Sequence, residues 1–249
     1  MRATYTIAAL LAALTVSTNI QADENAEKAQ KLIDGGIKAI GGPKALKKTA
    51  KMIFEDEGLY HGMGQGLPYQ GRFVTEYDKT AKFRFEILNA FVQVYNGKQG
   101  WYSLMGNTTE LDGPALKAVK ETVATNHIIT LPPLMKPSKD YKLSLAGSQE
   151  VEGEACEGVN VAHKGTPDVT LYFSKKTGLL RKSSTTVKSS EQGFKEVVEE
   201  NIFSEFDDQD GVKVAHKITI LRDNKKYVES KLKSVKFPES IDASEFQKP

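Results

Sequence analysis

The sequence is poor in the residues that build reactive or metal-binding centres. Its 249 residues contain one cysteine, Cys156, and four histidines. A single cysteine excludes an intramolecular disulfide, so a hydrophobic core must hold the fold together. The histidines lie far apart, and none has metal-ligand spacing to another histidine, a cysteine or a carboxylate. We therefore expect no metal and no cofactor.

Motifs that carry catalysis are also missing from the sequence. It has no nucleophile elbow, no phosphate-binding loop and no dinucleotide fingerprint. The glycine-rich segment 61–68 opens no helix, and the acidic run 207–211 lacks the final glutamate of a calcium loop. We expect a protein that is not an enzyme, and a hydrolase of unknown type remains the weakest alternative.

Neither sign of charge dominates the chain. Lysine and arginine number 34, aspartate and glutamate number 32, and the formal net charge is +2. This balance gives no reason to expect nucleic acid as a partner. Beyond the N-terminus, no hydrophobic run approaches the ~20 residues that span a bilayer.

The N-terminus has the pattern of a secretory signal peptide. Arg2 precedes an apolar run from Tyr5 to Val16, and a polar stretch then ends in the small residue Ala22. We expect a signal peptide over residues 1–22 and a mature domain over residues 23–249, exported to the periplasm. No cysteine directly follows the run, where the lipid-attachment site of a lipoprotein would lie, so we expect the mature chain to be soluble. The alternative, an uncleaved anchor, is disfavoured because this run is short of a bilayer span.

The mature sequence predicts a single α+β domain. Residues 25–40 carry an apolar stripe at helical spacing, interrupted at Gly35 and Gly36, and residues 114–129 form a second helical region. Elsewhere apolar residues alternate, most clearly from Ala81 to Ile87, and Asn96-Gly97 marks a hairpin turn. We expect about eleven antiparallel strands.

Aromatic residues are concentrated between positions 54 and 102, where they would give a curved sheet one apolar face. Such a face must be covered. The helices can cover part of it, and a ligand could cover the rest. A fully packed core without a cavity is the other interpretation of the same composition.

The order of these segments resembles the periplasmic outer-membrane lipoprotein carrier-like family, with the LolA/LolB-like fold. The resemblance covers most of the mature chain. It rests on segments 70–78 and 82–86, the hairpin 95–102, the hairpin Leu171–Leu180, and the terminal segments 210–214 and 241–246.

The resemblance implies an incomplete antiparallel β-barrel whose concave face is covered by helices. It also implies a cavity for a lipid, a lipoprotein acyl chain or another hydrophobic ligand, and an envelope membrane protein that donates or accepts it. Family carriers have an Arg-Pro pair before the third strand, where this sequence has Tyr77-Asp78. A divergent member that binds another lipid is therefore expected.

We predict two sets of ligand-contacting residues. The cavity set is Phe54, Phe73, Phe83, Phe85, Ile87, Val92, Val94, Trp101, Leu171 and Phe173, and the lid set is Leu116, Val119, Val123, Leu131, Leu134 and Met135. A non-enzymatic module for envelope protein interactions, with a filled barrel and a free sheet edge, is the alternative function.

Overall fold

The computed structural model describes residues 6–78, 80–88 and 90–249, with side chains from Asp23 onward. The predicted signal peptide, residues 1–22, lies outside the residues whose side chains are described. Among the described helices, none combines the length and hydropathy needed to cross a membrane.

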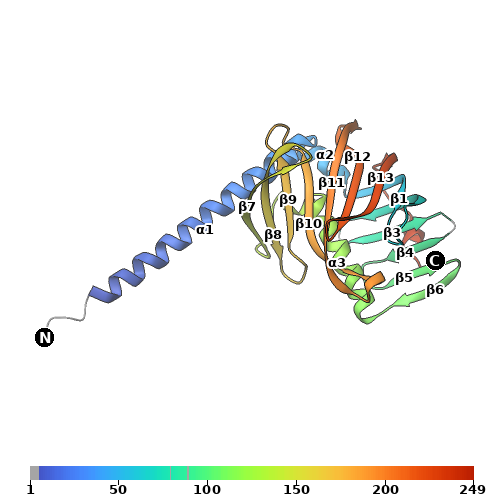
Figure 1. Ribbon diagram of the computed structural model, residues 1–249. Coiled ribbons are helices and arrows are strands. Elements are labelled where there is room, and N and C mark those ends of the chain that lie inside the picture. The colour runs from blue at the N-terminus through green and yellow to red at the C-terminus, as the bar shows by residue number, and fades with distance from the viewer. Residues whose placement is uncertain (1–5, 79, 89) are drawn as a thin grey trace.

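A single sheet of thirteen antiparallel strands dominates the structure (Figure 1). The strands are β1 (Lys51–Tyr60), β2 (Leu67–Glu76), β3 (Lys82–Ile87), β4 (Phe91–Tyr95), β5 (Gly100–Leu104), β6 (Asn107–Leu111), β7 (Tyr141–Val151), β8 (Glu154–His163), β9 (Val169–Ser174), β10 (Leu180–Ser189), β11 (Lys195–Gln209), β12 (Val212–Arg222) and β13 (Lys225–Lys236). The helices are α1 (Thr6–Ala39), α2 (Gly42–Lys48) and α3 (Gly113–Ile129), with short 3-10 turns η1 (Pro132–Leu134), η2 (Ser190–Gln192) and η3 (Ala243–Phe246).

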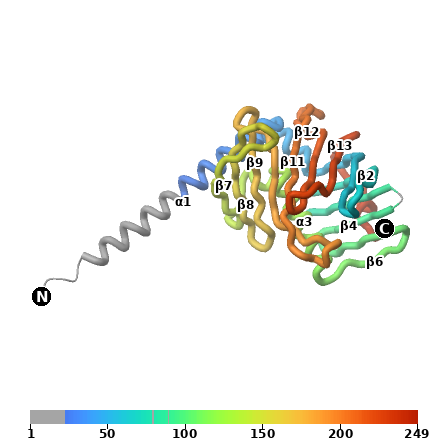
Figure 2. The backbone as a smooth tube through the Cα atoms, in the orientation of Figure 1, coloured from blue at the N-terminus to red at the C-terminus, as the bar shows by residue number. Residues whose placement is uncertain are grey.

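Two meanders make up the sheet. The first runs from β1 to β6 and the second from β7 to β13, and β13 pairs with β1 to join them. The sheet stays open, with β6 and β7 as its edges, and it curves around α3 (Figures 1 and 2). This confirms the expected α+β incomplete barrel. The expectation of about eleven strands fell short of the thirteen observed. The edge strand β6 was not predicted, because Asn107–Glu110 has polar residues in place of alternation.

The inner face of the sheet is packed against the helices at both ends. Near β8 and β9, Ala29, Ile33 and Ile37 of α1 are buried against Val161 and Leu171. Near β3 and β4, Val119 and Val123 of α3 are buried against the rings of Phe83 and Tyr95. The two helices therefore cover different parts of one face.

Helix α1 passes through Gly35 and Gly36 without the expected interruption. The structure gives a packing reason for the second glycine. A Cβ atom at Gly36 would lie 2.5 Å from the ring of Phe173, whereas nothing lies within 4 Å of one at Gly35. The glycine thus lets the helix axis approach β9 closely, and tertiary contact outweighs the low helix propensity of glycine.

The outer face of the first meander is covered by the C-terminal segment. Phe246 of η3 is buried against Val74, Val94 and Trp101. Glu245 accepts hydrogen bonds from both terminal nitrogens of Arg72, at 3.0 and 2.6 Å. Two-point contact between a guanidinium and a carboxylate fixes the direction of the tail as well as its position.

The glycine pair in α1 gives a matched test. Gly36→Ala should lower the free energy of unfolding by about 1–3 kcal/mol, because the added methyl group overpacks the contact with Phe173. Gly35→Ala should raise it by about 0.5–1 kcal/mol through helix propensity alone. Urea unfolding measures both changes, and equal effects of the two variants would contradict this account of the packing.

Candidate functional site

A ladder of phenylalanine rings crosses the inner face of the first meander. Phe54 and Phe73 stack with ring centroids 4.4 Å apart, and Phe73 and Phe85 stack at the same distance. Phe91 of β4 extends the row with an edge contact at 6.0 Å. All four rings are half-buried. Four adjacent strands therefore present one continuous aromatic strip that the helices cover only in part.

Five of the predicted cavity residues lie on the inner face that carries this strip. Phe54, Phe73, Phe83, Phe85 and Ile87 share the inner face, because the register pairs Phe54 with Phe73, Phe73 with Phe85, and Thr75 with Phe83. Phe83 is the most deeply buried of the five and packs beneath α3.

Three predicted cavity residues lie on the opposite face. Val94 pairs with Arg84 and Trp101, whereas Phe83 pairs with Tyr95, so Val94 and Phe83 point to opposite sides of the sheet. Val92, on the same strand, points to the same side as Val94. Val92, Val94 and Trp101 all lie beneath the C-terminal segment. The prediction that Val92, Val94 and Trp101 share the inner surface is therefore wrong. The reason is a change of phase at the turn between β3 and β4.

The other two predicted cavity residues belong to a separate, filled region. Leu171 and Phe173 of β9 are fully buried beneath α1 and η1. The predicted lid residues also divide between two regions. Leu116, Val119 and Val123 of α3 face the aromatic strip, whereas Leu131, Leu134 and Met135 pack with Leu171 and Phe173.

The apolar surface continues on the second meander, where we did not predict it. Phe203 pairs with Ile218 across β11 and β12, and Ile220 pairs with Val228 across β12 and β13. These side chains are half-buried. Alternation over residues 212–220 was the available signal, but the neighbours of β12 could not be assigned from it.

A polar group interrupts this apolar face at Asp56. The Asp56 side chain is 5% exposed, and its Oδ2 accepts hydrogen bonds from the hydroxyl groups of Tyr69 and Ser230. Its Oδ1 has no hydrogen-bond partner among the described residues and lies over Gly71, where a Cβ would approach it to 2.3 Å. Burial raises the pKa of this carboxyl above its ordinary value.

An open depression of about 650 Å³ lies beside this group, where the β1–β2 hairpin extends past β3. It is lined by Glu57, Gly58, Leu59, Pro68, Tyr69, Gln70, Ile87, Leu88 and Ala90. Tyr69 thus connects the two features, since its ring lines the depression while its hydroxyl group binds Asp56.

The far end of α3 is attached to the first meander by an aromatic stack. The His127 ring lies parallel to that of Tyr77, with centroids 4.6 Å apart. Burial lowers the pKa of His127 to about 4. The histidine is therefore a neutral packing group at neutral pH. Among the residues that the structure describes, no cluster of histidine, cysteine or carboxylate side chains could hold a metal ion.

Substituting Asp56 tests the cost of burying its charge. Because the pKa of the folded carboxyl is raised, wild-type stability falls as the pH rises above the unfolded-state pKa. Asp56→Asn should therefore gain thermal stability over wild type at pH 8 relative to pH 5. Glu55→Gln, at the exposed neighbouring carboxylate of β1, is the control. A gain that is the same at both pH values would contradict the prediction.

His127 should make the fold sensitive to mild acid. The pKa of His127 is about 4 in the folded state and about 6.5 in the unfolded state, so the unfolded state binds the proton first as the pH is lowered. The free energy of unfolding therefore falls as the pH drops from about 6.5 to about 4. Urea unfolding at pH 7 and pH 4.5 should show a loss of about 2 kcal/mol from this group. His127→Phe, which keeps an aromatic ring against Tyr77, should reduce that loss. An unchanged pH dependence would exclude His127 as its source.

The chain is similar in fold to several solved structures, at low sequence identity. No protein-family model and no curated protein matches the sequence. A DUF1329 family protein from Desulfovibrio piger has a TM-score of 0.61 at 12% identity, covering 90% of this chain and 97% of that one.

Two further solved structures are also similar over most of their length. A putative outer membrane lipoprotein-sorting protein domain from Vibrio parahaemolyticus has a TM-score of 0.57 at 10% identity, covering 89% of this chain and 97% of that one. A LolA superfamily protein from Nitrosomonas europaea has a TM-score of 0.54 at 11% identity, with coverages of 88% and 97%. The chain therefore has a divergent LolA-like fold.

Proposed function

We propose that this protein is a periplasmic carrier for a lipid, a lipoprotein acyl chain or another hydrophobic ligand. The observation that carries the proposal is the half-buried aromatic strip of Phe54, Phe73, Phe85 and Phe91 on the inner face. Each methylene group buried there contributes about 0.8 kcal/mol, so an acyl chain would bind without any catalytic group. We accordingly propose a non-enzymatic role without a cofactor.

The polar group at Asp56 would set the ligand's orientation. It lies on the same face as Phe54 and Phe73, beside the open depression. An acyl chain along the aromatic strip would leave its polar end near Tyr69 and Asp56. The single unpartnered oxygen of Asp56 favours a head group that donates a hydrogen bond.

The N-terminal part of α3, around Leu116, would act as the lid, while the predicted lid residues Leu131, Leu134 and Met135 would stay packed with Leu171 and Phe173. Where the resemblance implies an arginine that controls the lid, Tyr77 stacks on His127 of α3. This contact would keep the C-terminal end of α3 in place while Leu116, nearer the other end, moves away from the strip. The lid would thus differ from that of the carriers in how it is held.

The proposed carrier function also indicates where the protein works and which partners it has. We propose that residues 1–22 are a signal peptide and that residues 23–249 work in the periplasm. The Vibrio parahaemolyticus neighbour is described as a lipoprotein-sorting domain, which supports an acylated ligand and an envelope membrane protein as its donor or acceptor.

A filled interaction module is the second candidate function. The region around Leu171 and Phe173 is fully packed by α1, and each edge strand, β6 and β7, has one side that pairs with no strand of the described sheet. Such a module would use a sheet edge for binding and would take up no lipid.

Ligand uptake distinguishes the two candidates. Native mass spectrometry of protein purified from an expressing cell should detect a bound lipid, and the purified protein should take up a fluorescent fatty acid. Phe85→Ala should weaken that uptake about tenfold, because it removes a ring from the centre of the strip.

Val92→Ala is the matched control, since it shortens an apolar side chain on the adjacent strand but on the outer face. It should leave uptake unchanged. Protein that is free of lipid and takes up no fatty acid would contradict the carrier function and favour the interaction module.

A further inference from the structure

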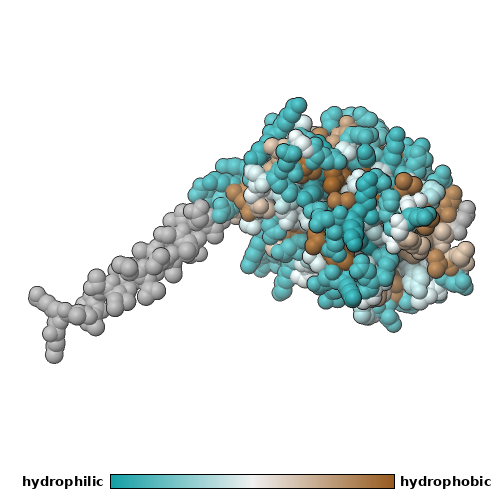
Figure 3. Space-filling model, in the orientation of Figure 1, coloured by the Kyte–Doolittle hydropathy of each residue, from teal (hydrophilic) through white to brown (hydrophobic). Residues whose placement is uncertain are grey.

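The large hydrophobic side chains that are exposed in the structure all lie at one rim of the sheet. Among the described residues they are Leu59, Met63, Leu67, Leu88, Leu104, Met105 and Val198. Met63 and Met105 are the most exposed, at 77% and 81%. Figure 3 shows hydrophobic residues along the right-hand edge of the molecule, where the hairpins of β3–β6 end.

The meander topology places these side chains together. Because β1 to β6 are consecutive antiparallel strands, the β1–β2, β3–β4 and β5–β6 hairpins all end at the same rim. The β12–β13 turn belongs there too, since the amide of His61 donates a 2.8 Å hydrogen bond to the carbonyl of Tyr227. Three successive hairpins thus present Met63, Leu88 and Met105 at their tips.

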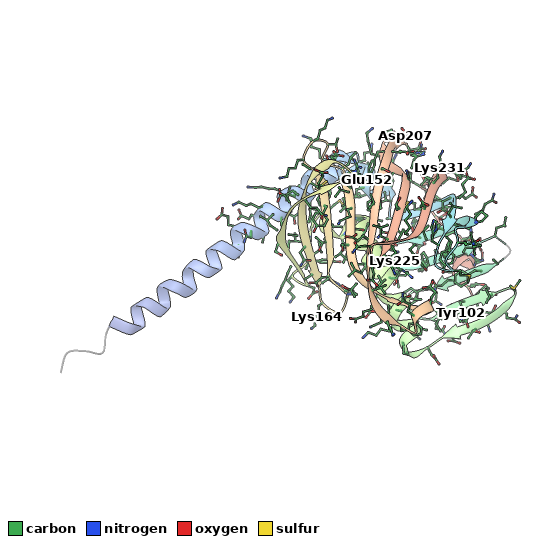
Figure 4. All side chains as sticks on the ribbon, in the orientation of Figure 1. Tyr102, Glu152, Lys164, Asp207, Lys225 and Lys231 are labelled. Carbon is green, nitrogen blue, oxygen red and sulfur yellow. The ribbon has the colours of Figure 1, made fainter. Side chains whose placement is uncertain are left out.

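These three tips contain no charged residue. Residues 62–68, 88–90 and 104–107 consist of apolar, glycine and neutral polar residues. The opposite rim differs, because its turns include Lys98, Glu152, Lys176 and Asp210, and none of its described residues is an exposed large hydrophobic. Figure 4 shows Glu152 and Asp207 at that rim, with Lys164 and Lys225 at the other.

Lysines lie beside the neutral tips. Lys225 and Lys226 are exposed on the β12–β13 turn next to the β1–β2 hairpin, and Lys195 is exposed at the start of β11. Three nearby acids have partners. Glu191 of η2 pairs with Arg222 at 2.9 Å, Glu229 pairs with Lys226 at 2.9 Å, and Asp223 accepts a 3.0 Å hydrogen bond from the amide of Val198. A neutral apolar surface flanked by ammonium groups matches the interface of a bilayer that contains anionic lipids.

We propose that this rim docks on the surface of an anionic lipid bilayer, with the β1–β2, β3–β4 and β5–β6 tips inserted among the lipids. The depression of about 650 Å³ between the first two tips favours lipid over a rigid protein, because mobile chains can fill a hollow between protruding loops. This docking does not depend on what the inner face binds.

Vesicle flotation tests the proposal directly. The chain from Asp23 onward, which contains every strand and all three hydrophobic clusters, is mixed with vesicles of phosphatidylcholine containing 30% phosphatidylglycerol. Wild-type protein should float with the vesicles. The double variant Met63→Ser, Met105→Ser should lower the partition coefficient at least about tenfold, whereas Met63→Leu, Met105→Leu should keep it.

The contribution of the lysines is tested by removing their charge, with lysines on the opposite rim as the control. Lys225→Gln, Lys226→Gln should reduce flotation several-fold, and Lys98→Gln, Lys176→Gln, with the same loss of charge, should not. Failure of wild-type protein to bind these vesicles, or equal binding by the serine and leucine variants, would overturn the proposal.

Uptake of a fluorescent fatty acid in solution should be the same for the serine variant and wild type. Loss of vesicle binding would therefore be separable from loss of ligand binding or of folding.

Discussion

The pairing of β1 with β13 is the contact on which the rest of the structure depends. It joins residues 53–60 to residues 228–236 in antiparallel register and makes one sheet from two meanders. Without it, the phenylalanine ladder of the first meander and the Phe203–Ile218 surface of the second would belong to separate sheets. Asp56 lies at this seam, beside a register shift, and its contacts with Tyr69 and Ser230 connect three adjacent strands.

Incomplete covering of the inner face follows from the size of the sheet. Thirteen curved strands provide more apolar surface than two helices can bury. Helix α1 packs against β7 and β8 through Ala29 and Ile33, and α3 packs against the first meander through Val119 and Val123. The strands between them keep half-buried side chains. The same geometry therefore accounts for a stable fold and for a surface on which an apolar ligand can lie.

Alternation was sufficient to predict most of the strands, the class of fold, and the shared face of five residues in the predicted cavity set. Phe83, Phe85 and Ile87 could be placed on one face because they lie in one uninterrupted strand. The phase of the next strand could not be predicted, because one residue more or less in the turn after Ile87 exchanges the two faces of β4. Val94 and Trp101 were misplaced for that reason. The Asp56 group was not predicted, because it depends on the pairing of β1 with β13, at opposite ends of the mature chain.

The same distant pairing affects how the chain can fold. Ile53 finds its partner, Lys236, only after nearly the whole chain is available, so the sheet has a high contact order and its closing step is intrinsically slow. Until then β1 is an unpaired edge in an otherwise ordered meander, and such edges recruit strands from other molecules. The charged residues Glu55, Asp56 and Glu57 in the middle of β1 discourage that association. Asp56, whose carboxylate is costly to bury in the folded protein, thus also protects a folding intermediate from association.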